Sequence, residues 1–315
     1  MKNIVVIGGG TGLSSMLSGM KKLEDVNLTA IITVADDGGS TGRIRELYNI
    51  PAVGDIRHVL AAMANDDSET LFRDLLNYRF GGNEDIGGHN LGNLIFLALM
   101  DSTGSFVGAI EAISKFLNVK GKIMPSTLDN VTLYATMSDG TLVRGEKNIP
   151  EVDNHIDHVH YQQDVIPHMQ SIRAIERADL IMYGIGSLYT SIMPNLIIPE
   201  ITEAIRKNNC PKIYFCNAMT QPGETTGYTV EDHIRAIEKH AYPGCVDVTV
   251  INDSRIPEET LEAYRKMGSS PVTLEQEVHE YIVIKRNLIM YDELGRVRHD
   301  PQKVLNVVKE IIDKM

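Results

Sequence analysis

A cluster of glycines near the start of the chain has the composition of a phosphate-binding loop. The stretch IVVIGGGTGLSSML, residues 4–17, places four glycines within five residues, directly after a run of branched apolar residues. The apolar residues that follow have helical spacing. A helix start with unpaired backbone N–H groups binds anions, so we expect Gly9, Gly10, Thr11 and Gly12 to contact a phosphate.

This loop matches neither of the two commonest glycine-rich phosphate motifs. The dinucleotide fingerprint G-x-G-x-x-G needs a third glycine where Leu13 or Ser15 stands, and the P-loop needs a Lys-Ser or Lys-Thr pair that is absent. The broken fingerprint and the lack of a catalytic His/Arg pair disfavour a NAD-dependent oxidoreductase. Thr11 offers a hydroxyl where the dinucleotide motif relies on backbone alone.

A pair of carboxylates follows the second apolar run. Asp36 and Asp37 stand where a Rossmann unit places the acceptor for ribose hydroxyls, and paired carboxylates can also hold a divalent cation such as magnesium. Aspartates that only cap a turn are the simpler interpretation. Ser40 lies next to the pair, and Arg43 or Arg45 could neutralise a diphosphate or belong to a solvated helix face.

Two later strand ends carry similar residues. A glycine-rich segment at 80–93 also contains two asparagines and His89, which could act as a base or as a hydrogen-bonding group. Three such strand ends in one sheet favour a shared ligand pocket. The residues that we expect to line it from these segments are Asn93, Gly186, Ser187, Tyr189, Thr190, Ser191, Asn195, Asn217 and Thr220.

Apolar runs alternating with helical patterns predict an α/β fold, a Rossmann-like three-layer sandwich with a mostly parallel sheet, over a single domain at 1–315. The expected strands are 4–7, 28–35, 178–186, 211–219, 246–253 and 280–286. Helices are expected at about 68–78 and 94–100. Three more are expected to begin after Asp55 as a cap, at the capping box of Thr229 and Asp232, and at Asp300-Pro301.

A β-rich insertion is expected at about 119–162. It contains the stretch GKIMP and two further strands joined by Ser138-Asp139-Gly140, which is typical of a hairpin. Asp153, His155, Asp157, His158 and His160 also fall here and resemble a metal cluster. Their alternation with apolar residues is better explained by a half-exposed strand.

Composition limits the class of protein. Hydrophobic residues make up 43% and charged residues 23% of the 315 residues, as in ordinary globular proteins, and no run approaches the ~20 apolar residues of a membrane span. A net charge of −12 disfavours nucleic acid and acidic membranes as partners. Three cysteines without a C-x-x-C pair, and an N-terminus that starts a strand, predict a cytoplasmic protein.

Six motifs, in order, resemble the bacterial gluconeogenesis factor family, whose members bind UDP-N-acetylglucosamine and are related to 2-phospho-L-lactate transferase. The motifs are GGGTGL (8–13), DDGGSTGRIR (36–45), GDIRHVL (54–60), GHNLGN (88–93), GSLYTSIMPNL (186–196) and TQPGET (220–225). The resemblance implies a role in cell shape and in growth under gluconeogenic conditions. It also implies ligand contacts by Tyr264, which could stack on uracil, and by Arg298 or its neighbour Arg296.

Two hypotheses follow. The first is a regulatory protein that senses a UDP-sugar and signals through a cell-wall-synthesis or other protein partner. The second is a transferase of the 2-phospho-L-lactate type, acting on a nucleotide diphosphate donor, with a metal at Asp36 or Asp37. No residue stands out as a nucleophile, and a homodimer is expected only by analogy with related α/β proteins.

Overall fold

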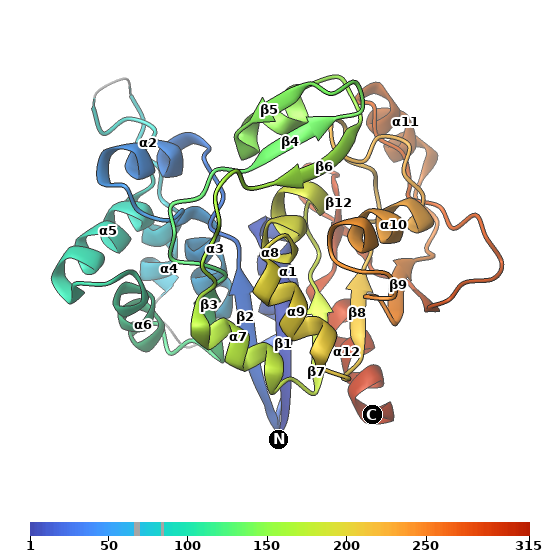
Figure 1. Cartoon of the computed structure of the whole chain (residues 1–315), viewed down its shortest axis with the longest axis horizontal. Coiled ribbons are helices and arrows are strands. Elements are labelled where there is room, and N and C mark those ends of the chain that lie inside the picture. The colour runs from blue at the N-terminus through green and yellow to red at the C-terminus, as the bar shows by residue number, and fades with distance from the viewer. Residues whose placement is uncertain (66–69, 83–84) are drawn as a thin grey trace.

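A seven-stranded sheet forms the centre of the computed structural model, which describes residues 1–65, 70–82 and 85–315 (Figure 1). The strand order is β10-β9-β8-β7-β1-β2-β3, and every neighbouring pair is parallel. The strands are β1 (Lys2–Gly8), β2 (Val26–Ile32), β3 (Lys122–Pro125), β7 (Leu180–Tyr183), β8 (Lys212–Phe215), β9 (Val248–Asn252) and β10 (Ile282–Arg286). The predicted parallel α/β fold is confirmed.

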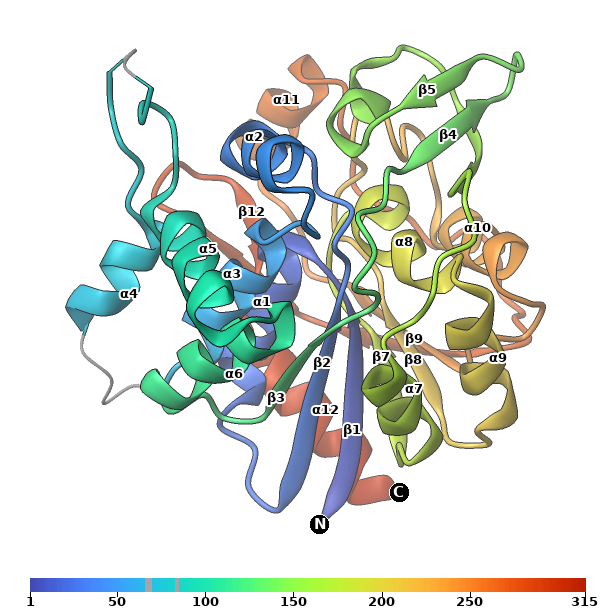
Figure 2. The same ribbon diagram turned by 60° about the vertical axis from the view of Figure 1, so that its left-hand side comes forward.

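Helices cover both faces of this sheet (Figure 2). On one side lie α1 (Gly10–Met20), α3 (Gly54–Met63), α4 (Thr70–Asn77), α5 (Leu91–Thr103), α6 (Phe106–Phe116) and α12 (Pro301–Lys314). On the other lie α7 (Met169–Glu176), α8 (Met193–Leu196), α9 (Pro199–Lys207) and α10 (Val230–His240). Helices α2 (Gly39–Tyr48) and α11 (Glu258–Lys266), the π-helical turn η2 (Leu188–Ile192) and the 3-10 helix η1 (Glu146–Glu151) complete the set at the carboxyl edge.

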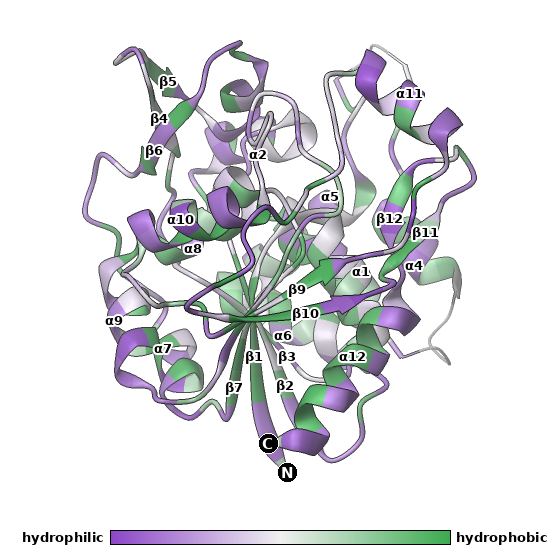
Figure 3. Cartoon of the chain, turned by 90° about the vertical axis from the view of Figure 1, so that its right-hand side faces the viewer, coloured by the Kyte–Doolittle hydropathy of each residue, from purple (hydrophilic) through white to green (hydrophobic). Residues whose placement is uncertain are grey.

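The central strands are apolar because both of their faces are covered (Figure 3). In β1, Ile4, Val6 and Ile7 are fully buried, and Ile31 and Ile32 of β2 are buried equally. Such runs cannot be placed at an exposed edge without loss of hydrophobic stabilisation, which is consistent with the interior positions of β1 and β2 in the sheet.

The predicted insertion is correct for its hairpin and wrong for its first strand. Strand β3, from the stretch GKIMP, pairs with β2 in the central sheet. The separate antiparallel sheet contains β4 (Tyr134–Met137), β5 (Leu142–Arg144) and β6 (Ile156–His160). In β6, Ile156 and Val159 are buried and the other three residues are more exposed, as expected of a half-exposed strand. The described residues contain no group of three or more His, Cys, Asp or Glu placed to hold a metal ion.

Two of the predicted helix starts are confirmed, one is displaced and one is wrong. Thr229 forms the capping box with Asp232, and Asp300 caps α12. The helix predicted from 94 begins earlier, at Leu91, after an Asn90 cap. Asp55 does not cap α3: the N-cap is Val53, and Asp55 lies within the first turn. The predicted start at 68 lies outside the described residues.

Strands β1 and β7 mark the point where the strand order reverses, which is where open α/β sheets bind ligands. The small antiparallel sheet, α2 and α11 lie beyond the carboxyl ends of the strands (Figure 1). A separate antiparallel pair, β11 (Ile289–Tyr291) and β12 (Val297–His299), precedes α12.

Within the described residues no single helix is long and apolar enough to cross a membrane. Helices α5 and α6, bent by 115° at the break between them, reach the length and apolar composition of a membrane span only when taken together.

Candidate functional site

The loops after β1, β7 and β8 meet at the carboxyl edge of the sheet. A Cβ atom on Gly12 would lie 2.7 Å from the Ile185 carbonyl oxygen, so only glycine permits this approach. The Asn217 side chain, after β8, donates to the Gly186 carbonyl at 2.9 Å. The structure thus brings three of the predicted ligand segments together.

The start of α1 is suited to an anion. Gly10 has a φ of +70°, and the helix has neither a side-chain cap nor an acidic residue in its first turn. The backbone N–H of Gly10 donates to Asp55, while Thr11 is exposed at the same helix start. The N–H groups of a first turn have no partner within the helix, so the amides after Gly10 can bind a phosphate.

The turn from Ser187 to Ser191 differs from what we expected. Glu224 accepts hydrogen bonds from the Tyr189 N–H (3.1 Å) and from the Thr190 hydroxyl (2.9 Å). The Tyr189 hydroxyl bonds to that of Tyr228. These polar groups of Tyr189 and Thr190 are therefore bonded to the protein itself.

Asn195 is fully buried and holds the glycine loop from behind. Its amide nitrogen donates to the Gly8 carbonyl at 3.3 Å and to the Ser191 carbonyl at 2.9 Å. Thr220 is buried, and its backbone carbonyl accepts from the Ser269 hydroxyl. Both residues are therefore bonded to the backbone of the loops and support the site from behind.

Carboxyl groups gather beyond β2. Asp36 accepts from the Gly38 N–H at 2.8 Å, and Asp37 accepts from the Lys147 N–H at 3.0 Å, which joins η1 to this edge. Burial raises the pKa of Asp55 to about 7, and the charge of Asp36 adds to the rise. Burial likewise raises the pKa of Glu146 to about 8, with further contributions from Asp36, Asp55, Glu224 and Asp37.

The arginines near these carboxylates differ in role. Arg45 is buried and donates to the Asp36 carbonyl at 2.8 Å and to Asn130, so it supports the loop instead of facing a ligand. Arg43 is exposed and donates to the Gly87 carbonyl at 2.8 Å. Arg57 is buried, and burial lowers its pKa to about 10.

Ser40 and Asn93 belong to one buried network. The Ser40 hydroxyl accepts from the Asn93 amide at 3.2 Å and lies 3.2 Å from the His89 ring. Asn93 in turn accepts from the Arg57 guanidinium at 3.0 Å. This network fixes α2 against α5, and desolvation lowers the pKa of His89, which keeps that ring neutral near pH 7.

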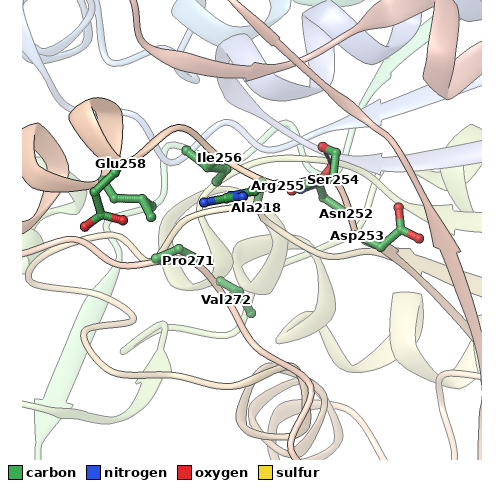
Figure 4. Close-up of a pocket in the computed structure, with 10 residues that line it drawn as sticks. Ala218, Asn252, Asp253, Ser254, Arg255, Ile256, Glu258, Pro271 and Val272 are labelled. Carbon is green, nitrogen blue, oxygen red and sulfur yellow. Dashed lines mark hydrogen bonds between the residues drawn. The ribbon is translucent and has the colours of Figure 1, made fainter.

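A pocket of about 240 Å³ lies at the ends of β8 and β9 (Figure 4). It is lined by Ala218, Asn252, Arg255, Glu258 and Leu261 among others, and Figure 4 shows Glu258 and Asp253 on opposite sides of it. Its volume is below the ~300 Å³ of a complete small-molecule site, so it suits one part of a larger ligand.

Tyr264 lies beside this pocket, and the neighbouring strand β12 carries Arg298. Tyr264 packs against a small apolar cluster that includes Ala218, and its hydroxyl accepts from the Val297 N–H at 2.8 Å. Arg298 is exposed on β12 and approaches Asp292 at 3.3 Å. Arg296 pairs with the same carboxylate at 2.7 Å, so the two arginines share a face as expected.

Comparison with known proteins identifies the family. The model of the family "2-phospho-L-lactate transferase CofD" matches residues 4–289, which is most of the chain. The chain belongs to the CofD family. The gluconeogenesis factor of Bacillus subtilis (strain 168) is 44% identical over 313 residues, covering 98% of each protein. That of Halalkalibacterium halodurans is 40% identical over 319 residues, covering 98% of this chain and 96% of the relative.

Solved structures of relatives have the same fold. A crystal structure of a protein from Bacillus halodurans superposes with a TM-score of 0.93 at 40% identity, covering 98% of this chain and 99% of that one. A second crystal structure of the same protein, which is a member of the UPF0052 family, gives a TM-score of 0.92 at the same identity. The expected resemblance to gluconeogenesis factors is confirmed across the chain.

Three acidic groups at this edge of the CofD family fold were missed by sequence reasoning. Asp55 was expected only as a helix cap, although its motif GDIRHVL was part of the resemblance. Glu224 lies in the motif TQPGET and could have been found in the same way. Glu146 had no signal, because it stands on an irregular segment and reaches the site only through the docking of η1.

We expect Asp55→Asn to stabilise the protein at high pH. Folding raises the pKa of Asp55 from 3.8 to about 7, so the folded state binds more protons than the unfolded state between about pH 4 and pH 7. The free energy of unfolding therefore falls as pH rises through this window and stays low above it. Because Asp55 is only partly buried as a residue, removal of its charge should add about 1–2 kcal/mol at pH 8 and almost nothing at pH 4.

Urea unfolding of both proteins at pH 4, 6 and 8 measures this difference. The comparison is between variant and wild type at each pH, since Glu146 and other groups titrate in both. A variant that is less stable than wild type at pH 8 would contradict the expected sign.

Proposed function

We propose that this chain binds UDP-N-acetylglucosamine along the carboxyl edge of its sheet. One observation supports the proposal above others: three kinds of site follow one another in strand order. A small pocket lies at β8 and β9, the glycine-rich helix start at β1, and carboxylates beyond β2. A nucleotide sugar has its parts in this sequence, namely a base, a diphosphate and a sugar rich in hydroxyl groups.

Each segment suits the chemistry of one part of this ligand. The pocket beside Tyr264 would take the uridine, and the amides after Gly10 the diphosphate. Carboxylates accept hydrogen bonds from sugar hydroxyls, so Asp36 and Asp55 would face the N-acetylglucosamine. Arg298 would neutralise a phosphate near the base.

The biological role would be regulatory. The relatives are named gluconeogenesis factors. We propose that ligand occupancy is relayed to a protein partner in cell-wall synthesis, in the cytoplasm, and that the chain is needed for cell shape and for growth under gluconeogenic conditions. We also propose that the chain forms a homodimer, and light scattering measures its mass in solution.

A transferase of the 2-phospho-L-lactate type is the second candidate, and membership of the CofD family favours it. The described residues hold no group of three or more acidic, His or Cys ligands for a metal, and Asp37 bonds to the Lys147 N–H. Magnesium would therefore have to be held partly by the phosphates of the ligand, as is usual for this ion.

A thermal-shift panel of UDP-N-acetylglucosamine, UDP, GDP and NAD, with and without magnesium, tests binding. Phosphorus NMR then tests turnover. Stabilisation by the UDP-sugar without turnover supports the regulatory role, and slow consumption of a nucleotide diphosphate donor supports the transferase. Stabilisation by NAD alone would reject both.

Tyr264→Ala and Arg298→Ala should each weaken UDP-N-acetylglucosamine binding about tenfold, because each removes one stacking or charge contact worth ~1–2 kcal/mol. Isothermal titration calorimetry measures the change. Tyr264→Phe keeps the ring and should keep most of the affinity, and Lys266→Ala, an exposed change on the same helix, should have no effect. Arg296→Ala tells which arginine is used. Unchanged affinity in the Tyr264 and Arg298 variants would remove the uridine from this pocket.

A further inference from the structure

The turn at Ser187–Ser191 surrounds a carboxyl group, that of Glu224. Burial raises the pKa of this group, whereas the hydrogen bonds that it accepts lower the pKa and favour the ionised carboxylate. The Glu224 carboxyl, 6% exposed, accepts from the Tyr189 N–H and the Thr190 hydroxyl. The Thr190 N–H and the Ser187 hydroxyl also donate to it. The Ser187 oxygen accepts from the Gln221 amide at 2.8 Å, which leaves its own proton for Glu224. These donors are the groups that would otherwise hold a phosphate.

This turn is in contact with the glycine loop of β1. A Cβ atom on Gly10 would lie 3.3 Å from the Ser191 hydroxyl, and one on Gly186 would lie 3.2 Å from the Gly9 carbonyl. The charge of Glu224 is therefore close to any phosphate bound at the start of α1. It cannot move away, because four donors fix its oxygens.

The two buried arginines near the carboxyl groups of the site, Arg45 and Arg57, donate hydrogen bonds to the protein itself. Arg45 donates to the carbonyls of Ala35, Asp36 and Val131 and to Asn130. Arg57 donates to Asn93, to Asn77 and to the Leu76 carbonyl. The donors to Glu224 are neutral N–H and hydroxyl groups. Among the described residues no ion pair therefore cancels the field of Glu224 at a bound phosphate.

The charge of the ligand decides how much this field matters. A diphosphate esterified at both ends carries two negative charges, whereas a free terminal phosphate carries nearly one more at pH 7.5, because its second pKa is about 6. One extra charge roughly 10 Å from a fixed carboxylate, at an effective dielectric constant of about 20, changes affinity about tenfold.

We infer that Glu224 occupies the anion position of the Ser187–Ser191 turn, and so makes the site select diphosphates esterified at both ends over ligands with a free terminal phosphate. The inference rests on the proposed function and adds a specificity-determining residue to it. It requires no contact between Glu224 and the sugar.

Three ligands separate charge from sugar contacts: UDP, the methyl ester of UDP, and UDP-N-acetylglucosamine. Calorimetry without magnesium, at pH 7.5, should show that wild type binds the methyl ester about tenfold more tightly than UDP. In Glu224→Gln this ratio should fall to about two, mainly through tighter UDP binding. Magnesium, which neutralises the terminal phosphate, should reduce the ratio in wild type.

Glu231→Gln is the matched control. Glu231 is 7% exposed and accepts from the Glu275 and Gln276 N–H groups, but it lies on α10, away from the glycine loop. The Glu231→Gln variant should keep the wild-type ratio of the affinities for the methyl ester of UDP and for UDP.

Two results would overturn the inference: a wild-type ratio near one, or an equal loss of affinity for UDP and its methyl ester in Glu224→Gln, which would show a purely structural role. If Glu224→Gln does not fold, the wild-type ratio decides. Absence of UDP-N-acetylglucosamine binding in wild type would reject the proposed function and the inference with it. Binding of that ligand with a ratio near one rejects the inference alone.

Discussion

Gly12→Ala should abolish UDP-N-acetylglucosamine binding and destabilise the protein by about 2–4 kcal/mol. The added Cβ would lie 2.7 Å from the Ile185 carbonyl oxygen and 3.2 Å from the Gly186 Cα. Both are backbone atoms at the end of β7, so no side chain can rotate to relieve the contact. Either the helix start or the β7 loop must shift, and the amides that would hold the diphosphate shift with it.

Urea unfolding and calorimetry measure the two effects separately. Gly81→Ala is the matched control, because a Cβ there would meet nothing within 4 Å. It should leave stability within about 0.5 kcal/mol and binding unchanged. Wild-type affinity in a Gly12→Ala protein would show that the ligand does not use this loop.

Gly223→Ala is the second change with a large expected effect. Its Cβ would lie 1.8 Å from the Pro150 carbonyl oxygen, and its φ of +79° disfavours any side chain. Pro150 belongs to η1, so the substitution should push this segment off the site as well as strain the turn. We expect a loss of about 3 kcal/mol or more.

Gly140→Ala separates backbone strain from steric contact. Gly140 has a φ of +85° in the β4–β5 hairpin, with nothing within 4 Å of a Cβ. That control should lose only about 1 kcal/mol, the cost of the left-handed conformation. Hydrogen exchange of residues 145–152 should rise in Gly223→Ala alone. Similar losses in the two variants would mean that the contact with Pro150 can relax.

Much of the fold could be predicted from the sequence because the patterns that specify it lie within short stretches of the chain. Four consecutive branched residues before Gly8 can only be a buried strand, and Thr229 with Asp232 forms a capping box within a single turn. The stretch GKIMP forms a strand of four residues, Lys122–Pro125, and so short a strand does not specify its partner, which is why the prediction placed it in the wrong sheet. Strand β3 pairs with β2, about ninety positions away, and that choice depends on packing.

The site was predictable to the extent that glycine marks it. Glycines 9, 10, 12 and 186 were expected at a ligand edge, and the structure brings their loops into contact. The polar residues beside them have less uniform positions. Asn195 and Asn93 are buried and hold the loops from behind, whereas Thr11 and Arg43 are exposed. Residue type alone does not distinguish these cases, because an amide or hydroxyl can support a loop as well as bind a ligand.

The amino-acid sequence by itself determined the parallel α/β architecture, the glycine-rich strand ends and the family. Those properties depend on residue type and spacing over short distances. Only the tertiary structure decided that Glu224 fills the turn after β7, that Arg45 supports a loop, and that Glu146 joins Asp36 and Asp55. Charges interact through space, and segments far apart in the chain supply them, so their balance at the site exists only once the sheet, the insertion and the loops have packed together.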